Sequence, residues 1–212
     1  MNVAAIKDLI TKTARKPLIF FGPSGSGKST LARHVLTKYK QSFDMSVSCT
    51  TRAMRPNEQH GESYYFLSVE SFKAKIAGGE MLEYVEYNSN YYGTPISELS
   101  RITSEGKTPV LDIDYNGVSR MIELFGSANS VRVFVNVTDA EVLRERLRSR
   151  KTETEESLNQ RLAITLQELE YLSAHKLYTH MINNDVLEQA KKEVEQLVIG
   201  QYNISPGSKR TP

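Results

Sequence analysis

The sequence contains one segment that constrains its fold more than any other, namely Gly22-Pro23-Ser24-Gly25-Ser26-Gly27-Lys28-Ser29-Thr30. It matches the phosphate-binding P-loop pattern, in which a glycine, four further residues and a second glycine precede a lysine and a serine or threonine. The apolar run 18–21 comes directly before the segment and a helical pattern follows it, which is the context that a P-loop requires. A chance match in a chain of this composition has odds on the order of one per cent.

Each part of this loop has a chemical task in binding a nucleoside triphosphate. Its glycines allow the backbone to curl around an anion with the N–H groups pointing inward, and the N-terminus of the following helix adds a partial positive charge. Lys28 can reach the β- and γ-phosphates, and the Ser29 hydroxyl can ligate Mg²⁺. We therefore expect ATP at residues 22–30, although the motif does not identify the group that accepts the phosphate.

Asp112 and Asp114 end a second apolar run, 110–114. Strand alternation predicts that both carboxylates lie on the same side of this strand. A carboxylate at the end of a parallel strand beside a P-loop is the expected partner of Mg²⁺, usually through a water molecule, and we assign that role to Asp112. The alternatives are a solvated strand end and a helix cap.

Apolar runs and helical patterns alternate along most of the chain. The predicted strands are 18–21, 45–48, 109–113, 131–137 and 181–183, and the predicted helices are 28–39, 95–105, 116–125, 140–150, 155–175 and 186–199, after a short N-terminal helix within 1–16. This order predicts an α/β fold of the P-loop NTPase type, with a parallel sheet and helices on both faces. In such folds, ligands bind at the carboxyl ends of the strands.

The pattern changes between residues 49 and 94, where we expect a small mixed α/β subdomain inserted into the main fold. Its predicted elements are aromatic strands at 64–67 and 81–87, a helix that begins at Ser68 and ends at Gly78-Gly79, and a hairpin turn at 88–90. Thr94 and Pro95 then resume the main fold as the N-cap and first residue of a helix.

The 212 residues suit a single domain with a core of about 17–48 and 95–200, and a tail at 203–212 whose composition predicts mobility. A net charge of +2 gives no reason to expect nucleic acid as a partner, and no apolar run approaches the length of a membrane span. Cys49 is the only cysteine and cannot form an intrachain disulfide, which suits a reducing compartment. We therefore expect a cytoplasmic protein, as a monomer or a small homo-oligomer, that does not act at a membrane.

Several further segments occur in the order and at the spacing of guanylate kinases, and the chain closely resembles that family. They are Ser46–Pro56, Gly61–Phe66, Asn90–Thr94, Leu111–Asp114 and Arg150–Glu156, so that with the P-loop the resemblance covers roughly Leu18 to Leu197. It implies that ATP donates its γ-phosphate to GMP, with Mg²⁺ as cofactor, to give ADP and GDP.

The resemblance also implies which residues bind the phosphate of GMP. They are Arg52, Arg55, Tyr64 and Tyr92, with Asp112 nearby. Two guanidinium groups can bind a dianionic phosphate and two phenols can donate further hydrogen bonds, and Arg52 is also expected to act in catalysis. Taken singly, the tyrosines could equally be packing residues.

On the guanine side the resemblance implies Ser48, Glu83, Thr94 and Asp114. A carboxylate such as Glu83 can accept from both the N1–H and the 2-amino group of guanine, a pair of donors that adenine does not present. The alternative for Glu83 is a solvated strand residue.

Arg146 and Arg150 lie four residues apart and so share one helical face, and Arg161 follows. By resemblance these three arginines belong to a lid, about 146–161, that closes on the transferring phosphate, where charge spreads over the phosphoryl oxygens. Arginines on an exposed helix are otherwise usually solvated. Asn184 aligns with an asparagine that contacts the adenine of ATP.

The sequence departs from the family pattern at three positions. Lys151 replaces a glycine after the lid arginine, Asn116 replaces a glutamine after the aspartate pair, and Val186 replaces a second aspartate near the adenine site. None of these changes removes a group that the reaction requires, and they bear on lid mobility and nucleotide affinity.

Two other functions fit parts of the sequence. Guanylate-kinase-like domains of scaffold proteins bind phosphorylated partners without catalysis, but they usually lack a working P-loop, whereas Lys28 and Ser29 are present here. A P-loop kinase of another small phosphorylated acceptor would have no use for the guanine-side residues. We therefore predict a kinase whose partners are ATP and GMP.

Overall fold

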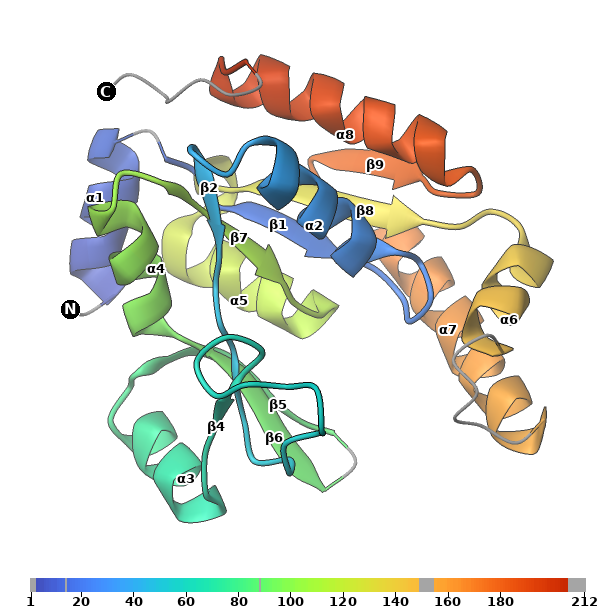
Figure 1. The fold of residues 1–212 in the computed structure, drawn as a ribbon, viewed down its shortest axis with the longest axis horizontal. Helices are drawn as coiled ribbons and strands as arrows, with labels where there is room; N and C mark the ends of the chain where they lie inside the picture. The colour runs from blue at the N-terminus through green and yellow to red at the C-terminus, as the bar shows by residue number, and fades with distance from the viewer. Residues whose placement is uncertain (1–2, 14, 88, 149–154, 206–212) are drawn as a thin grey trace.

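The computed structural model describes residues 3–13, 15–87, 89–148 and 155–205, and its centre is a parallel sheet (Figure 1). The sheet has five strands in the order β2-β7-β1-β8-β9, and all neighbouring pairs are parallel. The strands are β1 (Leu18–Phe21), β2 (Phe43–Met45), β7 (Thr108–Asp112), β8 (Val131–Asn136) and β9 (His180–Asn183). The predicted α/β fold with a parallel sheet is confirmed.

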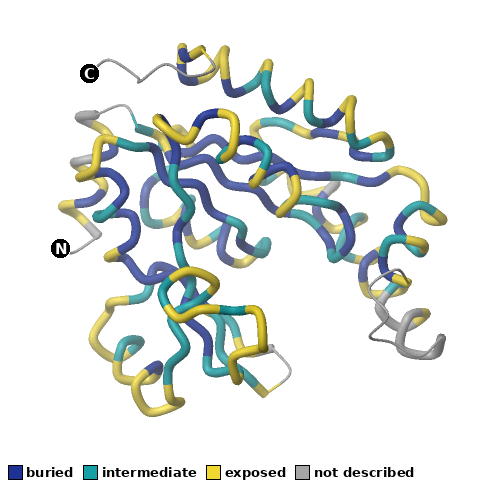
Figure 2. The backbone as a smooth tube through the Cα atoms, viewed as in Figure 1, coloured by how far each residue is buried: buried dark blue, intermediate teal, exposed yellow. Residues whose placement is uncertain are grey.

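Alternate residues of β1 belong to two hydrophobic cores. Leu18 and Phe20 pack in a cluster with side chains of α2 (Lys28–Lys38) and α8 (Leu187–Tyr202). Ile19 and Phe21 pack on the other face with α1 (Val3–Thr13), α4 (Ile96–Ser104), α5 (Tyr115–Phe125) and α7 (Glu155–His175). All four residues of β1 are fully buried, and Figure 2 shows the strands in the middle of this sheet coloured mostly as buried. A strand that is covered on both faces is apolar at every position, which explains the run Leu-Ile-Phe-Phe.

The segment between β2 and α4 forms a second sheet with the strand order β4-β3-β6-β5. Its elements are β3 (Cys49–Thr50), β4 (Tyr65–Phe66), α3 (Val69–Ala77), β5 (Met81–Tyr87) and β6 (Asn90–Pro95). The predicted N-cap of α3 is correct, because the Ser68 hydroxyl accepts a hydrogen bond from the Ser71 backbone. The remaining elements are η1 (Ser127–Asn129) and α6 (Ala140–Arg148), which projects away from the sheet beside α7 (Figure 1). None of the helices in the described ranges is both long and apolar enough to cross a membrane.

Local signals misplaced several boundaries. The helix that we expected to begin at Pro95 begins one residue later, because Thr94 and Pro95 both pair with β5 as the last residues of β6, and the N-cap of α4 is Pro95 rather than Thr94. The strand predicted at 45–48 lies instead at β2, so residues 46–48 are the connection to the second sheet. Ile204, within the tail that we expected to be mobile, packs in the first core, and the structure does not describe residues 206–212.

One buried carboxylate joins the two sheets at this connection. Glu98 of α4 is 2% exposed and accepts hydrogen bonds from the Val47 backbone (2.9 Å) and the Tyr65 hydroxyl (3.0 Å). Arg101 completes the arrangement through two donors, Nε and Nη2, at 3.0 and 2.9 Å. Burial alone would raise the pKa of Glu98, but the hydrogen bonds from Arg101 and Val47 outweigh it and the pKa is lowered. Glu98 therefore holds the connection and the second sheet against the core.

We predict that Glu98→Ala lowers the free energy of unfolding by about 2–4 kcal/mol, because it removes a buried acceptor and leaves three partly buried residues without their hydrogen-bond partner. Urea unfolding followed by circular dichroism measures the change. Glu105→Ala is the matched control, since Glu105 also contacts Arg101 (3.2 Å) but is 44% exposed, and it should change the free energy by less than about 0.5 kcal/mol. Equal effects of the two variants would contradict the role of Glu98.

Candidate active site

The P-loop begins where β1 ends and leads directly into α2. Gly22, Gly25 and Gly27 have φ angles of 144°, 83° and 89°, which L side chains rarely adopt. Space is also limiting, because a Cβ on Gly27 would lie 2.3 Å from the Asn184 amide nitrogen. The loop therefore has the backbone conformation and the close packing that its sequence predicted.

Asn184 follows β9 and holds the P-loop from outside the loop itself. Its Nδ2 donates to the Ser26 carbonyl at 2.7 Å, its backbone N–H donates to the Asn136 carbonyl at 2.8 Å, and the residue is 1% exposed. Its Oδ1 is buried and has no hydrogen-bond partner among the described residues. The residue that we assigned to adenine thus has a structural contact with the phosphate loop and one unused acceptor beside it.

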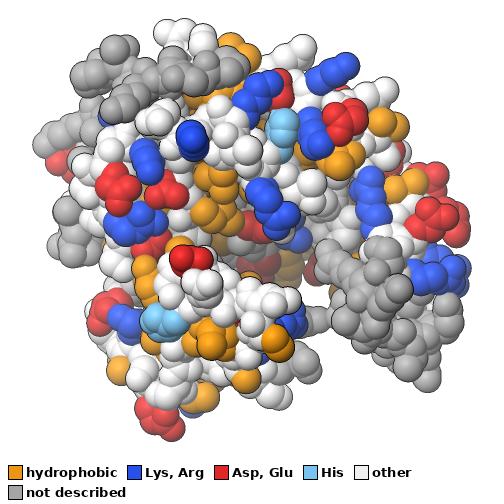
Figure 3. Space-filling model, viewed as in Figure 1, with side chains coloured by type: hydrophobic (Ala, Val, Ile, Leu, Met, Phe, Trp, Pro, Cys, Tyr) orange, Lys and Arg blue, Asp and Glu red, His pale blue; other side chains and the backbone are white. Residues whose placement is uncertain are grey.

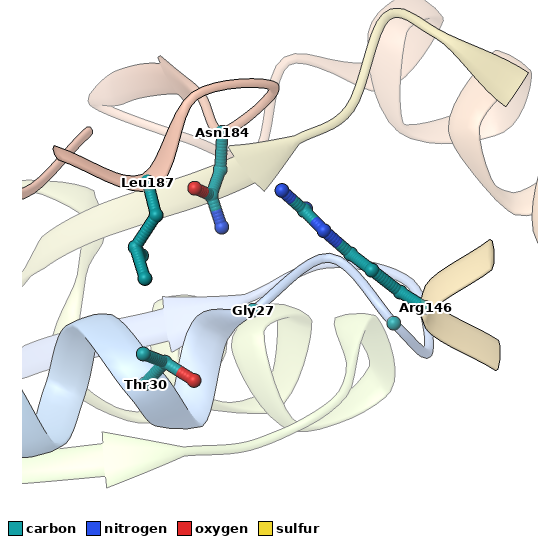
Figure 4. Close-up of a pocket in the computed structure, with 6 residues that line it drawn as sticks. Gly27, Thr30, Arg146, Asn184 and Leu187 are labelled. Atoms are coloured by element: carbon teal, nitrogen blue, oxygen red, sulfur yellow. The ribbon is translucent and has the colours of Figure 1, made fainter. Parts of the chain in front are cut away.

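A cleft of about 260 Å³ opens beside Asn184. Its lining comprises Gly25, Gly27, Thr30, Arg146, Asn184 and Leu187 (Figure 4). The guanidinium of Arg146 extends from α6 toward Asn184, while Thr30 and Leu187 lie on the opposite side. The cleft combines backbone of the P-loop, an apolar side chain and one arginine, which suits a nucleotide whose phosphates lie on the loop.

Asp185 fixes the start of α6, and the sequence analysis missed this residue. Its carboxylate accepts from the Thr138 backbone (2.9 Å), the Thr138 hydroxyl (2.7 Å) and the Asp139 backbone (3.2 Å). Desolvation opposes its ionisation, but these hydrogen bonds outweigh it and lower the pKa of Asp185. Arg146 donates to the Asp185 carbonyl at 3.3 Å, so the end of β9 positions both the P-loop and the first lid arginine.

The contacts of the other two arginines predicted for the lid, Arg150 and Arg161, cannot be described. Arg150 and the departure at Lys151 lie outside the described residues, and the side chain of Arg161, in α7, is likewise not described. Their assignment to the lid stays a prediction.

A second cleft, of about 310 Å³, lies between the P-loop and the second sheet. Its lining comprises Lys28, Met45, Ser46, Ser48, Glu62, Ser63, Tyr64 and Asp112. In Figure 3 the surface is hollowed between the lobe of the second sheet and the main body, with charged side chains of both signs around it. Lys28 and Asp112 on one side and Ser48 and Tyr64 on the other, four residues predicted from separate segments, therefore meet in one cleft.

The two aspartates predicted at the end of one strand have different positions. Asp112 is the last residue of β7, and its Oδ2 accepts a hydrogen bond from the Ser29 hydroxyl at 2.5 Å. Asp114 lies beyond the strand and caps α5, where its Oδ1 accepts from the Gly117 backbone at 2.8 Å. The prediction that both carboxylates belong to the strand is wrong, because the cap of α5 ends β7 earlier; for Asp114 the alternative of a helix cap is correct.

Glu83 lies on β5 opposite Thr94 of β6 and is 9% exposed. A Cβ on Gly117, in the first turn of α5, would lie 3.2 Å from its Cγ, so Glu83 packs against the start of that helix. Burial raises the pKa of Glu83 to about 7, and the nearby carboxylate of Asp114 adds to the shift. The alternative of a solvated strand residue is therefore wrong.

Arg52 lies beside both predicted tyrosines. Its guanidinium carbon is 5.4 Å from the centre of the Tyr64 ring, and that ring contacts the Tyr92 ring edge-on at 6.2 Å. Its partner is Glu58, which the sequence analysis did not single out, through hydrogen bonds of 2.9 and 2.8 Å. Arg55 is exposed and donates its backbone N–H to the same carboxylate at 2.8 Å.

The comparisons with known proteins agree on one family. A family model described as guanylate kinase matches residues 14–201. A guanylate kinase of Sus scrofa is 38% identical over 175 residues, which cover 82% of this chain and 87% of the relative. A guanylate kinase of Homo sapiens is 37% identical over 181 residues, with coverages of 85% and 91%. The crystal structure of guanylate kinase from Anaplasma phagocytophilum has a TM-score of 0.65 at 26% identity, and the match covers 87% of this chain and 85% of that one.

We predict that Asn184→Ala lowers the free energy of unfolding by about 1–3 kcal/mol and weakens ATP binding, because the Ser26 carbonyl loses its buried donor. Chemical unfolding and calorimetric titration with ATP measure the two effects. Asn183→Ala is the control, since the Asn183 side chain is exposed and accepts a hydrogen bond from the Asn136 side chain (2.9 Å), away from the P-loop. If both variants keep the stability and ATP affinity of the parent, Asn184 does not support the loop.

Proposed function

This chain belongs to the guanylate kinase family, and we propose that its two clefts divide the substrates of an ATP:GMP phosphotransferase between them. The reaction of this family transfers the γ-phosphate of ATP to GMP and gives ADP and GDP. The observation that carries the proposal is the position of Lys28, which belongs to the P-loop and also lines the second cleft. The same lysine therefore lies next to the proposed binding sites of both the phosphate donor and the phosphate acceptor.

On the donor side, we assign the phosphates of ATP to the backbone of residues 22–30 and its nucleoside to the cleft of Thr30, Arg146, Asn184 and Leu187. The positive-φ glycines allow the loop N–H groups to face the phosphates. The place of Asn184 in the lining of this cleft supports its assignment to adenine.

Mg²⁺ fits the oxygen pair formed by Ser29 and Asp112. A hydroxyl and a carboxylate that already approach to 2.5 Å are the hard oxygen ligands that this ion prefers. Mg²⁺ commonly keeps several water ligands and binds substrate phosphates together with one or two protein oxygens. When bound, Mg²⁺ would neutralise charge on the phosphates.

On the acceptor side, we propose that Arg52, Arg55, Tyr64 and Tyr92 bind the phosphate of GMP. The residues proposed around its guanine are Ser48, Glu83, Thr94 and Asp114, and Asp112 is proposed to lie near its phosphate. These residues come from, or lie next to, a GMP-binding subdomain at about 49–94, while the core comprises about 17–48 and 95–200 and the lid about 146–161. The contact of Arg52 with Tyr64 and the burial of Glu83 support this division.

The reaction needs no general base in this proposal, because the attacking atom is already a phosphate oxygen. Lys28, Arg52 and Arg146 neutralise the charge that spreads over the transferring group, and Arg150 and Arg161 join them from the lid. Catalysis then rests on alignment of the two phosphates, charge neutralisation and exclusion of water when the lid closes.

We predict that Lys28→Ala lowers kcat by at least about 10²-fold, because it removes a cation that binds the transferring phosphoryl group. A coupled assay of ADP release with ATP and GMP measures the rate. Lys38→Ala is the control: Lys38 ends the same helix but pairs with Glu195 at 2.6 Å, away from both clefts, and kcat should stay within about twofold. A folded Lys28→Ala variant with parental turnover would remove Lys28 from the mechanism.

Glu83 should make GMP binding depend on pH. The ionised carboxylate accepts from both guanine donors, whereas the protonated form carries a hydrogen on one oxygen. Because the pKa of Glu83 is about 7 in the free protein, kcat/KM for GMP should be constant above that pH and fall up to about tenfold per unit below it.

Glu83→Gln separates this effect from titration of GMP, whose phosphate has a second pKa near 6. In this variant the fall of kcat/KM for GMP below pH 7 should disappear. Its preference for GMP over AMP should also drop, mainly through weaker GMP binding, because the amide presents a donor to a guanine donor. The measurements are pH profiles and the ratio of kcat/KM for GMP and AMP. An unchanged ratio would show that Glu83 does not read the base.

A further inference from the structure

Glu58 binds Arg52, in the proposed phosphate-binding cluster, through both of its carboxylate oxygens. Its carboxylate oxygens accept from Arg52 Nη1 at 2.9 Å and Nη2 at 2.8 Å, and both side chains are less than one-fifth exposed, at 16% for Arg52 and 18% for Glu58. Arg52 Nη1 also donates to the Ala53 carbonyl at 2.7 Å. The Tyr64 and Phe66 rings lie at 5.4 and 5.7 Å from the guanidinium carbon. The arginine thus has one orientation defined by four neighbours.

The contacts with Glu58 and Ala53 do not use the Nε–Nη2 edge of the guanidinium. A guanidinium has five N–H donors in a rigid plane, and its two bidentate edges are Nη1–Nη2 and Nε–Nη2. Glu58 takes the Nη1–Nη2 edge and Ala53 takes the remaining Nη1 hydrogen. The Nε–H and the second Nη2 hydrogen point in the same direction. Two parallel donors of this kind can bind two oxygens of one phosphate. The phenol of Tyr92 lies close enough to this guanidinium to interact with it.

Glu58 also connects Arg52 to the second arginine of the cluster. Its Oε2 accepts from the Arg55 backbone N–H at 2.8 Å, and its own N–H donates to the Arg55 carbonyl at 3.1 Å. The Arg52 guanidinium and the Arg55 backbone hold the pKa of Glu58 near 2, so the carboxylate is ionised throughout the physiological range. One carboxylate therefore fixes the geometry of residues 52–58.

We propose that Glu58 is a positioning residue that holds Arg52 with its Nε–Nη2 edge directed at the phosphate of the acceptor nucleotide. The inference rests on the assignment of that phosphate to Arg52 proposed above. Glu58 does not contact the nucleotide itself. Its negative charge opposes the phosphate by Coulomb repulsion, and its benefit is an arginine that loses no rotamer freedom when the nucleotide binds.

The experiment compares binding of GMP with binding of guanosine, which has the same base and ribose but no phosphate. Glu58→Ala should weaken GMP binding about 10- to 100-fold, as expected when a bidentate charged contact loses its support, and should leave guanosine binding and the KM for ATP within about twofold. Glu58→Gln should have a smaller effect in the same direction, because the amide keeps one acceptor for Arg52. Glu80→Gln is the matched control, since Glu80 is exposed and pairs with Lys75 in the same lobe.

Arg52 variants separate this inference from the proposed site. In an Arg52→Lys background, where no fork exists to orient, Glu58→Ala should weaken GMP binding less than about threefold. Tighter GMP binding by Glu58→Gln, or equal losses for GMP and guanosine, would overturn the positioning role. If Arg52→Ala weakens GMP binding but neither Glu58 variant does, this inference alone is wrong. If Arg52→Ala leaves GMP binding unchanged, the phosphate assignment is wrong as well.

Discussion

Burial of β1 on both of its faces determines where the chemistry of this chain can occur. Leu18 and Phe20 on one side and Ile19 and Phe21 on the other are fully buried, so the strand has no freedom to shift relative to the helices that cover it. The loop that follows starts from this fixed end and turns through three glycines into α2. The backbone N–H groups at the start of α2 are therefore held in place by the hydrophobic core, before any ligand is bound.

The neighbouring strands add polar contacts at the same edge of the sheet. β7 ends at Asp112, whose carboxylate accepts from Ser29, and β9 is followed by Asn184, whose amide donates to the Ser26 carbonyl. Asp185, the next residue, accepts hydrogen bonds from the loop before α6, and its carbonyl accepts one from Arg146. It therefore holds both the start of α6 and the side chain of Arg146. This convergence follows from the parallel order of the strands, because all of their carboxyl ends lie on one side. Groups that are distant in the sequence become one site for that reason.

The sequence predicted the parallel sheet, the P-loop, the inserted lobe and most of the helices, because each has a local pattern of its own. It misplaced features that depend on pairing between distant segments. Pro95 has the local features of a helix start, but its cross-strand contact with Met81 keeps it in β6. Asp185 and Glu58 were missed because a carboxylate in a polar loop has no local signal, and only the folded chain brings each to its partners. The burial of Glu83 likewise depends on α5, which lies more than 30 residues away.

Several groups that we assign to substrates already have protein partners in the structure. Ser29 donates to Asp112, Lys28 donates to the Pro23 carbonyl at 3.3 Å and Arg52 is paired with Glu58. Since Lys28 and Arg52 are partly buried, part of the desolvation cost of binding a phosphate to them is met on folding. These partners differ in how easily a phosphate replaces them. The Pro23 carbonyl, at 3.3 Å, competes only weakly with a phosphate for Lys28. The Glu58 carboxylate binds Arg52 bidentately and is expected to stay bound to it. We therefore expect substrates to replace the weak partners and to add to the strong ones, so that the cations change position little during the reaction.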